Sequence, residues 1–448
     1  MSSSVSQSGA AASTKREQRE AYLGQLLASV GGLVPTDLAP DLRRTAEALV
    51  KEQTFPHGKQ ETWRFTDLSP MLSIPFTAVD KPVAIDAAAI EPVLLPEATV
   101  RLVTVNGRFN AALSDVNDLP AGVVAGSLQE LWSDAAIRSQ LESRLAQQPG
   151  GHEVFTALNT AGFQDAMVLW IPRNCAVEAP VQLINVAIPQ PSPKVVQPRA
   201  LVVAETGSAV TFVEEFWGRG IGDHFTNGVS EVWVEDNAQV VHVRSQRETQ
   251  STFHIGKTVV SQGRDSHYRC ITVALGSRLA RHHLEVYQQG AQTTTHLYGL
   301  GAIQDAQVSD TQTIVALQHP HGTVDQLQKN IIDDRAHSVF SGRIIVPHDA
   351  QLTNASQLNR NLLLSDKGRV DTKPQLEIVA DNVQCAHGAT VSQLENNELF
   401  YLQSRGISAE QAQRLLIYAF AMEILNQIPL TTLRQQLTET ISQLVDTD

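Results

Sequence analysis

The stretch that decides the fold is residues 329–405, which read KNIIDDRAHSVFSGRIIVPHDAQLTNASQLNRNLLLSDKGRVDTKPQLEIVADNVQCAHGATVSQLENNELFYLQSR. Short β-type runs follow one another here, separated by polar or glycine-containing turns. The runs end at a Cys-X-His pair, Cys385 and His387, and the pattern then changes to that of a helix. The sequence therefore predicts a β-domain that ends near this pair, and we expect the function at this junction.

The same β pattern extends upstream to about residue 168. Its clearest runs are ALVVAE, AVTFVEEF, EVWVED, VVHVRS, HLEVYQ and RIIVP, with little that resembles a long helix between them. A tripeptide Asp/Asn/Gly-Ala-Gln recurs at irregular spacing and indicates one tight corner used repeatedly: residues 237–239, 290–292, 305–307 and 349–351. A parallel β-helix, a β-sandwich and a large barrel all fit this pattern, which does not choose among them.

Helical spacing predicts helices on both sides of the β-region. Apolar residues recur at helical intervals in residues 15–50 and again in about 127–147, where Pro149-Gly150-Gly151 ends the helix. We therefore expect a disordered, low-complexity tail over residues 1–20, a mainly helical N-terminal domain over 21–150, a β-domain over 151–400 and a helical C-terminal domain over 401–448.

In the C-terminal domain, Ser408 and Gln411 have the spacing of a capping box. The first helix carries an apolar stripe and ends before Pro429, and a second helix carries another stripe. The first stripe is Ala412, Leu415, Leu416, Ala419 and Phe420; the second is Leu433, Leu437, Ile441 and Leu444. These helices either cap the open edge of the β-domain or dock a partner, and the two roles are compatible.

The composition excludes several classes of partner. The formal net charge of -13 opposes binding to nucleic acid or anionic lipid, which both need clustered Lys and Arg. No apolar run approaches the ~20 residues that cross a bilayer. Three separated cysteines, Cys175, Cys270 and Cys385, do not form a disulfide framework, so we expect a cytoplasmic protein in a reducing compartment.

Four segments in order carry a resemblance to a known family: VFSGRI, LLLSDKGRVDTKPQLEI, CAHGAT and LFYLQSRGI, between residues 339 and 407. Together they resemble the C-terminal signature of the SufB and SufD subunits of the SUF iron–sulfur assembly machinery. PHGKQETWRFTDLSPML, residues 56–72, is similar to the family's N-terminal Trp-Lys/Arg-aromatic-Thr segment. The chain lacks the additional cysteine-rich segment typical of SufB, so the resemblance is to the SufD branch.

The resemblance implies a mainly β fold, with a right-handed parallel β-helix core flanked by N-terminal and C-terminal helical domains. It also implies a non-enzymatic scaffold that pairs with SufB through the β-helix and binds the ABC-type ATPase SufC through its C-terminal helices. ATP then acts only through SufC, and an iron–sulfur cluster forms transiently at the interface shared with SufB. The implied SufC-docking residues are Arg405, Gly406, Ile407, Arg414, Leu415 and Phe420.

Cys385 and His387 are the candidate metal ligands. Side chains alternate along a strand, so these two face the same side while Ala386 faces the other. Thiolate and imidazole both bind iron, but a cluster usually takes four protein ligands, so other ligands must come from the fold or a partner. Taken alone, the pattern fits a buried thiol and a structural histidine better. The resemblance instead implies that His387 lies at the SufB interface, with Cys385 the weaker candidate.

Other polar residues fit structural roles. Gly256-Lys257-Thr258 resembles the end of a phosphate-binding loop, but Ser251 replaces the required first glycine. His282-His283, His296 and His319-Pro320-His321 are expected at the surface or in turns, as are the pairs Glu214-Glu215 and Asp333-Asp334.

Two alternative functions belong to different classes. A β-helix carbohydrate-active enzyme would need clustered acidic and aromatic residues, and only 5% of residues are aromatic. A structural homodimer through the surface that SufB would otherwise occupy is the second alternative.

Overall fold

The computed structural model describes the backbone of residues 4–445 and the side chains of residues 15–444. Its helices are α1 (Ser4–Gly31), α2 (Pro40–Lys51), α3 (Ser69–Leu72), α4 (Leu128–Leu131), α5 (Ala135–Glu142), α6 (Val154–Gly162), α7 (Asn396–Ser404), α8 (Ala409–Leu425) and α9 (Thr431–Val445), with 3-10 turns η1 (Glu61–Trp63), η2 (Ala87–Ala89) and η3 (Glu91–Val93). None of the described helices is both long and apolar enough to cross a membrane.

The strands are β1 (Thr77–Ala78), β2 (Val100–Val105), β3 (Arg108–Phe109), β4 (Val124–Ser127), β5 (Met167–Ile171), β6 (Val181–Ala187), β7 (Lys194–Val196), β8 (Arg199–Ala204), β9 (Ala209–Gly218), β10 (His224–Val234), β11 (Gln239–Arg247), β12 (Thr252–Gln262), β13 (His267–Ala274), β14 (Leu279–Gln288), β15 (Thr294–Ile303), β16 (Val308–Ala316), β17 (Thr323–Ile332), β18 (His337–Val346), β19 (Asn354–Leu363), β20 (Arg369–Ile378) and β21 (Gln384–Ser392).

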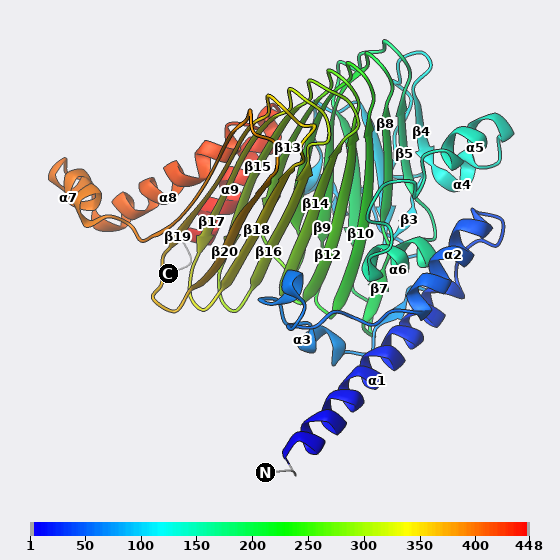
Figure 1. Ribbon diagram of the computed structural model, residues 1–448, viewed down its shortest axis with the longest axis horizontal. Coiled ribbons are helices and arrows are strands. Elements are labelled where there is room, and N and C mark those ends of the chain that lie inside the picture. The colour runs from blue at the N-terminus through cyan, green and yellow to red at the C-terminus, as the bar shows by residue number, and fades with distance from the viewer. Residues whose placement is uncertain (1–3, 446–448) are drawn as a thin grey trace.

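Successive strands from β8 onward alternate between two sheets. One sheet runs in the order β8, β10, β12, β14, β16, β18, β20, and the other runs β9, β11, β13, β15, β17, β19, β21. Every neighbouring pair in these two series is parallel. The chain therefore winds as a solenoid, which crosses the centre of Figure 1 as a row of long strands. This confirms the predicted parallel β-helix and excludes the sandwich and the barrel.

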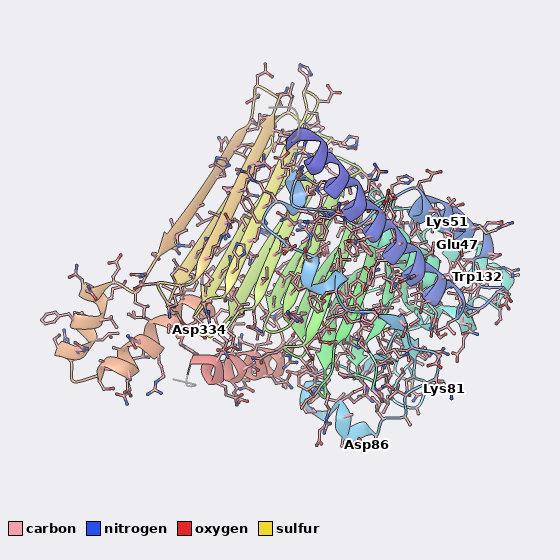
Figure 2. All side chains as sticks on the ribbon, turned by 90° about the horizontal axis from the view of Figure 1, so that it is seen from below. Glu47, Lys51, Lys81, Asp86, Trp132 and Asp334 are labelled. Carbon is pink, nitrogen blue, oxygen red and sulfur yellow. The ribbon has the colours of Figure 1, made fainter. Side chains whose placement is uncertain are left out.

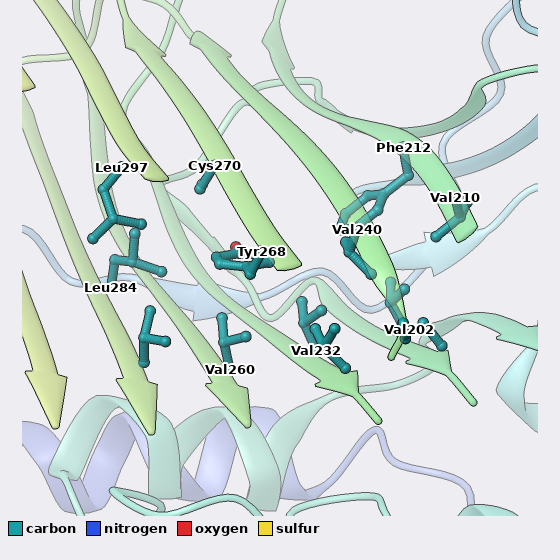
Figure 3. Packing of buried hydrophobic residues seen from close by; sticks show 14 of the residues in the cluster. Val202, Val210, Phe212, Val232, Val240, Val260, Tyr268, Cys270, Leu284 and Leu297 are labelled. Atoms are coloured by element: carbon teal, nitrogen blue, oxygen red, sulfur yellow. The ribbon is translucent and has the colours of Figure 1, made fainter. Parts of the chain in front are cut away.

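Equivalent residues of successive coils stack in columns, because each strand pairs with the strand one coil earlier along nearly its whole length. Apolar inward residues form the main core, which includes the stacked Val202, Val232 and Val260 and, on the next strand of the same sheet, Leu284. Figure 3 shows these side chains packed between the two sheets. Inward-facing residues alternate with outward-facing ones along a strand, so the apolar runs in the sequence are short.

Two of the four corners predicted from the recurring tripeptide share one conformation. Asn237 and Asp305, the first residues of their tripeptides, both have a φ of +57°. Asn and Asp tolerate this left-handed conformation better than most residues. In the other two corners the left-handed residue is Gln292 or Leu352, so those corners differ in backbone conformation. Asp333 and Asp334 follow β17 in a turn, and Figure 2 labels Asp334.

The N-terminal region differs from the prediction in three respects. Residues 4–20 are helical, whereas a disordered tail was expected. Two features favour the helix: alanine, at positions 10–12, has the highest helix propensity, and Arg16 pairs with Glu20 at 2.6 Å across one turn. The helix expected over 127–147 is two short helices, because the Asp134 carboxylate caps α5 and starts a new helix. The region expected to be mainly helical also supplies β2 and β4 to the sheets.

The segment of residues 56–72 fastens the N-terminal region to the solenoid. Trp63 packs against Phe155 and lies 3.8 Å, ring centroid to guanidinium carbon, from Arg281 of β14. Thr66 donates a hydrogen bond to Asp310 of β16, which also pairs with Arg281. The Trp-Arg-Phe-Thr pattern therefore has a structural role here. Helices α2, α4 and α5 lie at the end of the solenoid formed by its first strands, on the side where Figure 2 labels Glu47 and Lys51 of α2 and Trp132.

Several polar residues expected at the surface are buried instead. Glu214 and Glu215 are 1% and 0% exposed. Glu214 accepts a hydrogen bond from Ser230, and Glu215 pairs with Arg247 at 2.8 Å. His282 is also buried and bonds to Thr258 Oγ1 at 3.0 Å. The expectation was wrong because strands such as β9 are buried on both faces along part of their length, so polar residues on either face are paired inside.

A buried histidine makes the stability of the fold depend on pH. His224 is fully buried, and neither ring nitrogen has a hydrogen-bond partner among the described residues. Burial lowers the pKa of His224 to about 4, although the charge of Glu248 opposes this. A histidine in the unfolded chain has a pKa of about 6.5. Above that pH His224 is neutral in both states and its contribution to the stability of the fold is fully present. This contribution is lost as the pH falls from about 6.5 toward about 4, because the unfolded chain then binds a proton that the fold does not.

We expect the free energy of unfolding to fall by about 2 kcal/mol between pH 7 and pH 5 from His224 alone. Replacing His224 with leucine removes this contribution, because leucine does not titrate. Urea unfolding at the two pH values measures the effect. His348→Gln is the control, since His348 is exposed in a turn and its loss should leave the difference unchanged. An equal pH difference in His224→Leu and the native chain would contradict the prediction.

The C-terminal helices leave the solenoid after β21. The capping box of Ser408 and Gln411 forms as predicted. Helix α9 packs through the predicted residues Leu433, Leu437 and Ile441. Helix α7 stands away from the body in Figure 1, and none of its residues is buried.

Candidate functional site

The candidate site lies at the end of the solenoid formed by β20 and β21. Each strand pairs with an earlier strand on one side, β18 or β19, and is the last strand of its sheet among the described residues. In a parallel sheet, alternate residues direct their backbone N–H and C=O groups toward one or the other neighbouring strand. Half of these groups in β20 and β21 therefore point along the solenoid axis, away from the earlier coils. The end of the solenoid therefore offers two strand edges and the last inward-facing side chains.

Cys385 and His387 both lie on β21 and face inward. Cys385 pairs with Ala355 and His387 with Gln357, and both partners are buried. Ala386 pairs with Ser356, which is exposed. Cys385 is half-buried against the main core, whereas His387 is exposed because no described coil stacks on it. The same-face arrangement expected from strand alternation is thus present.

The two side chains differ in chemical availability. Burial raises the pKa of the Cys385 thiol, and the backbone N–H of Ala355 offsets only part of this. The thiol form, a weak metal ligand, is therefore favoured at Cys385. His387 offers an accessible imidazole, which binds iron through an unprotonated nitrogen.

This chain alone provides too few ligands for a cluster. No group of three or more His, Cys, Asp or Glu residues in the described part of the chain is arranged to hold a metal ion. A cluster usually takes four protein ligands. Cys385 and His387 fit part of a ligand set, so a cluster held here requires ligands from a second protein.

Two inward columns run through the interior to this site, and both carry amide side chains in the coils nearest to it. The inward column that ends at His387 passes through Phe212, His242, Cys270, Leu297, Gln326 and Gln357. The next column passes through Glu214, Arg244, Thr272, Gly299, Gln328, Asn359 and Ala389. Thr372 of β20 donates to Asn359 Oδ1 at 2.7 Å, which connects the two sheets near the open end. Gln357 donates to the side chain of Gln326, and Asn359 donates to the backbone carbonyl of Gln328, so this part of the interior is polar and hydrogen-bonded.

Apolar side chains are exposed around the open end and on α7. Val379 is 69% exposed, and Phe400 and Tyr401 of α7 are 72% and 58% exposed. Leu358, Ile378 and Val391 are exposed to a smaller extent. An exposed apolar surface beside two unpaired strand edges is typical of a protein–protein interface.

A second candidate surface is a groove of about 570 Å³ on α8 and α9. Its lining residues are Ile407, Gln411, Arg414, Leu415, Tyr418, Ile441 and Ser442. Leu415 and Tyr418 are 46% and 40% exposed. The opposite face of α8, which includes Ile417, Ala421 and Ile424, packs in the core cluster that α8 shares with α9 and the solenoid. The groove therefore has an apolar floor with a cationic side chain in its lining.

The structure brings only some of the expected docking residues to this groove. Ile407, Arg414 and Leu415 line it. Gly406 has a φ of +87° and forms the turn before α8, and Arg405 packs on Tyr401. Phe420 faces the solenoid instead, with Lys329 Nζ 3.8 Å from its ring centroid.

Sequence reasoning missed several residues that lie at these surfaces. Tyr418 is one turn from Arg414 and Leu415, so helical spacing could have identified it. Ile441 and Ser442 come from α9, and only the packing of the two helices brings them to the groove. Gln357 had no signal in the sequence, because its position beside His387 depends on strand register.

Lys257, in the segment that resembles a phosphate-binding loop, has structural partners. It lies on β12, pairs with Glu285 at 2.8 Å and donates to the carbonyl of Gly150 at 3.0 Å. His283 faces the same carboxylate at 3.3 Å. No glycine-rich turn precedes Lys257 in this strand, which agrees with the exclusion of a phosphate site.

Comparison with known proteins places these features in a family. Residues 187–420 match the family model described as SUF system FeS cluster assembly, SufBD core domain. Residues 36–183 match the model described as SufBD protein N-terminal region. The core match includes both β21 and most of α8.

Named relatives cover nearly the whole chain. The Synechocystis iron-sulfur cluster assembly SufBD family protein slr0076 is 46% identical over 411 residues, 89% of this chain and 90% of that protein. Protein ABCI7, chloroplastic, of Arabidopsis thaliana is 34% identical over 88% of this chain and 83% of its own length. Iron-sulfur cluster assembly protein SufD of Escherichia coli is 29% identical over 91% of this chain and 93% of its own length.

Proposed function

The chain belongs to the SufBD family of iron–sulfur cluster assembly proteins, as a SufD-type member, and from this premise we propose that it is a non-enzymatic scaffold that pairs with SufB and binds SufC. The nascent cluster is the cargo of this scaffold and forms at the SufB interface. His387 contributes a ligand there, and Cys385 lies beside it as a secondary candidate. We expect this function in the cytoplasm.

The observation that carries the proposal is the open end of the solenoid. It combines unpaired strand edges, exposed apolar residues and an accessible imidazole on the last coil. A second β-helix can add its strands to these edges by main-chain hydrogen bonds. Because Cys385 and His387 are the two candidate ligands among the described residues, a partner that adds thiolates completes the cluster site.

The groove on α8 and α9 supports the proposed role of SufC. It is separate from the open end, so both partners can bind at once. ATP is bound by SufC in this scheme, and this chain transmits the resulting movement through its C-terminal helices. The apolar groove with Arg414 in its lining suits an amphipathic element of a partner.

The family match bears differently on the two alternative functions. Membership in an iron–sulfur assembly family replaces the carbohydrate-active enzyme as the explanation of the β-helix. A homodimer uses the same open end, and we propose it as the state of the chain when SufB is absent. Its molar mass in solution, measured with and without SufB, separates the two states.

The scaffold proposal is tested by anaerobic purification after co-expression with SufB and SufC. We expect a complex that contains all three proteins together with iron and acid-labile sulfide. The matched control is SufB and SufC without this chain, which should hold much less iron and sulfide. Failure of the native chain to join the complex, or equal cluster content without it, would contradict the proposed function.

A further inference from the structure

Gln357 of β19 is a polar side chain held in the interior with one unpaired atom. It is 2% exposed. Its Nε2 donates to Gln326 Oε1 at 2.8 Å, and Gln326 Nε2 donates to Thr313 Oγ1 at 2.9 Å. These bonds orient the amide so that its nitrogen faces the preceding coil. Its Oε1, by contrast, has no hydrogen-bond partner within the described residues.

The next residue in the same inward column is His387. Parallel strands lie about 4.8 Å apart, so paired inward side chains of β19 and β21 stack directly on one another. A buried acceptor without a donor is unfavourable. An imidazole always carries at least one N–H, and His387 therefore supplies a donor on the open side of Gln357.

We propose that Gln357 is a positioning residue for His387. Its Oε1 accepts a hydrogen bond from one ring nitrogen of His387 and thereby fixes the tautomer. The other ring nitrogen then keeps its lone pair for an iron ion or an iron–sulfur cluster at the open end. This inference rests on the proposed function, in which His387 contributes a ligand.

The chemistry of metal-binding histidines supports this role. Such a histidine usually donates its second ring N–H to a carbonyl or carboxylate, which fixes the ring orientation. A side-chain carbonyl can only accept, so it selects the nitrogen that carries the proton. The direction of the Gln326–Gln357 amide chain determines that Gln357 presents its oxygen, rather than its nitrogen, as the remaining polar atom.

Gly342 makes room for this arrangement. It lies on β18 within the VFSGRI segment and belongs to an inward column of the opposite sheet. A Cβ at position 342 would overlap the amide nitrogen of Gln357. Glycine is therefore needed there for the Gln357 amide to reach Gln326, which gives this part of the family signature a physical reason.

The experiment measures the tautomer of His387 in the full chain, without any cluster. The chain is labelled with ¹⁵N-histidine and studied at pH 8.5. The ring signals of His387 are identified by their loss in His387→Ala. We expect one tautomer to exceed the other about tenfold in the native chain, because a hydrogen bond holds it.

Gln357→Met should return the tautomer ratio of His387 to that of a free histidine side chain, because methionine fills the space without an acceptor oxygen. Gln357→Glu should retain the selection, because a carboxylate still accepts. Gln328→Met is the matched control, since it removes a buried amide from the neighbouring column. A mixed tautomer in the native chain, or no change in Gln357→Met, would overturn the inference.

The two proposals fail in different ways. If the tautomer depends on Gln357 but the complex of His387→Ala keeps its iron, then the positioning holds and the proposed ligand role of His387 is wrong. If the complex needs His387 but its tautomer is indifferent to Gln357, then the scaffold function stands and this inference is wrong.

Discussion

Replacing His387 with alanine is expected to lower the iron and acid-labile sulfide content of the complex with SufB and SufC about tenfold or more. Loss of a residue that only orients a metal ligand costs about 10–100-fold in metal affinity, so loss of a ligand should cost at least as much. The complex itself should still assemble, because the exposed His387 ring contributes little to the core. Iron and sulfide assays on the anaerobically purified complex measure the effect.

His348→Ala is the matched control for this substitution. His348 is another exposed histidine of the solenoid, but it lies in the turn after β18, where it pairs with Asp349. Its replacement should leave iron and sulfide content unchanged. Cys385→Ala separates the two candidate ligands, and we expect a smaller loss because the thiol is half-buried and its pKa is raised. Undiminished cluster content in His387→Ala would remove His387 from the proposed site.

The sequence predicted the parallel β-helix through its family resemblance, whereas its periodicity left three β architectures open. The reason is physical. A coil of this solenoid buries residues on both faces where helices or loops cover the outer side, as in β12, every residue of which is buried. Simple alternation of apolar and polar residues is then lost, and pairs such as Glu214-Glu215 appear to be surface charges although they are paired inside.

The candidate site could be predicted in part. Strand alternation was enough to place Cys385 and His387 on one face, since that depends only on local geometry. Gln357 could not be found in the same way, because it is 30 positions upstream and meets His387 only through the register of β19 with β21. The direction in which Phe420 faces could not be found from the sequence either, because α8 is apolar on more than one side and only the contact with Lys329 shows which side faces the solenoid.

The second large expected effect is on the binding of SufC at the groove on α8 and α9. Its apolar lining is a single patch, and Leu415 and Tyr418 are its most exposed apolar side chains. A partner helix that covers them removes them from water, and such central apolar residues commonly carry about 2 kcal/mol or more of binding energy. A charge placed there would lose its hydration when the partner binds, which adds to the loss.

Leu415→Asp is therefore expected to weaken binding of SufC about 100-fold, which corresponds to a loss of about 3 kcal/mol. The fold should be unaffected, because Leu415 faces away from the C-terminal core formed by Ile417, Ala421 and Ile424. Titration calorimetry with purified SufC measures the affinity, and Ile221→Asp is the control because Ile221 is fully exposed in a distant turn. Equal affinity in Leu415→Asp and the native chain would exclude the groove as the SufC site. Retained binding of SufB by the same variant would show that the loss is confined to the groove, since the two surfaces lie on different elements of the chain.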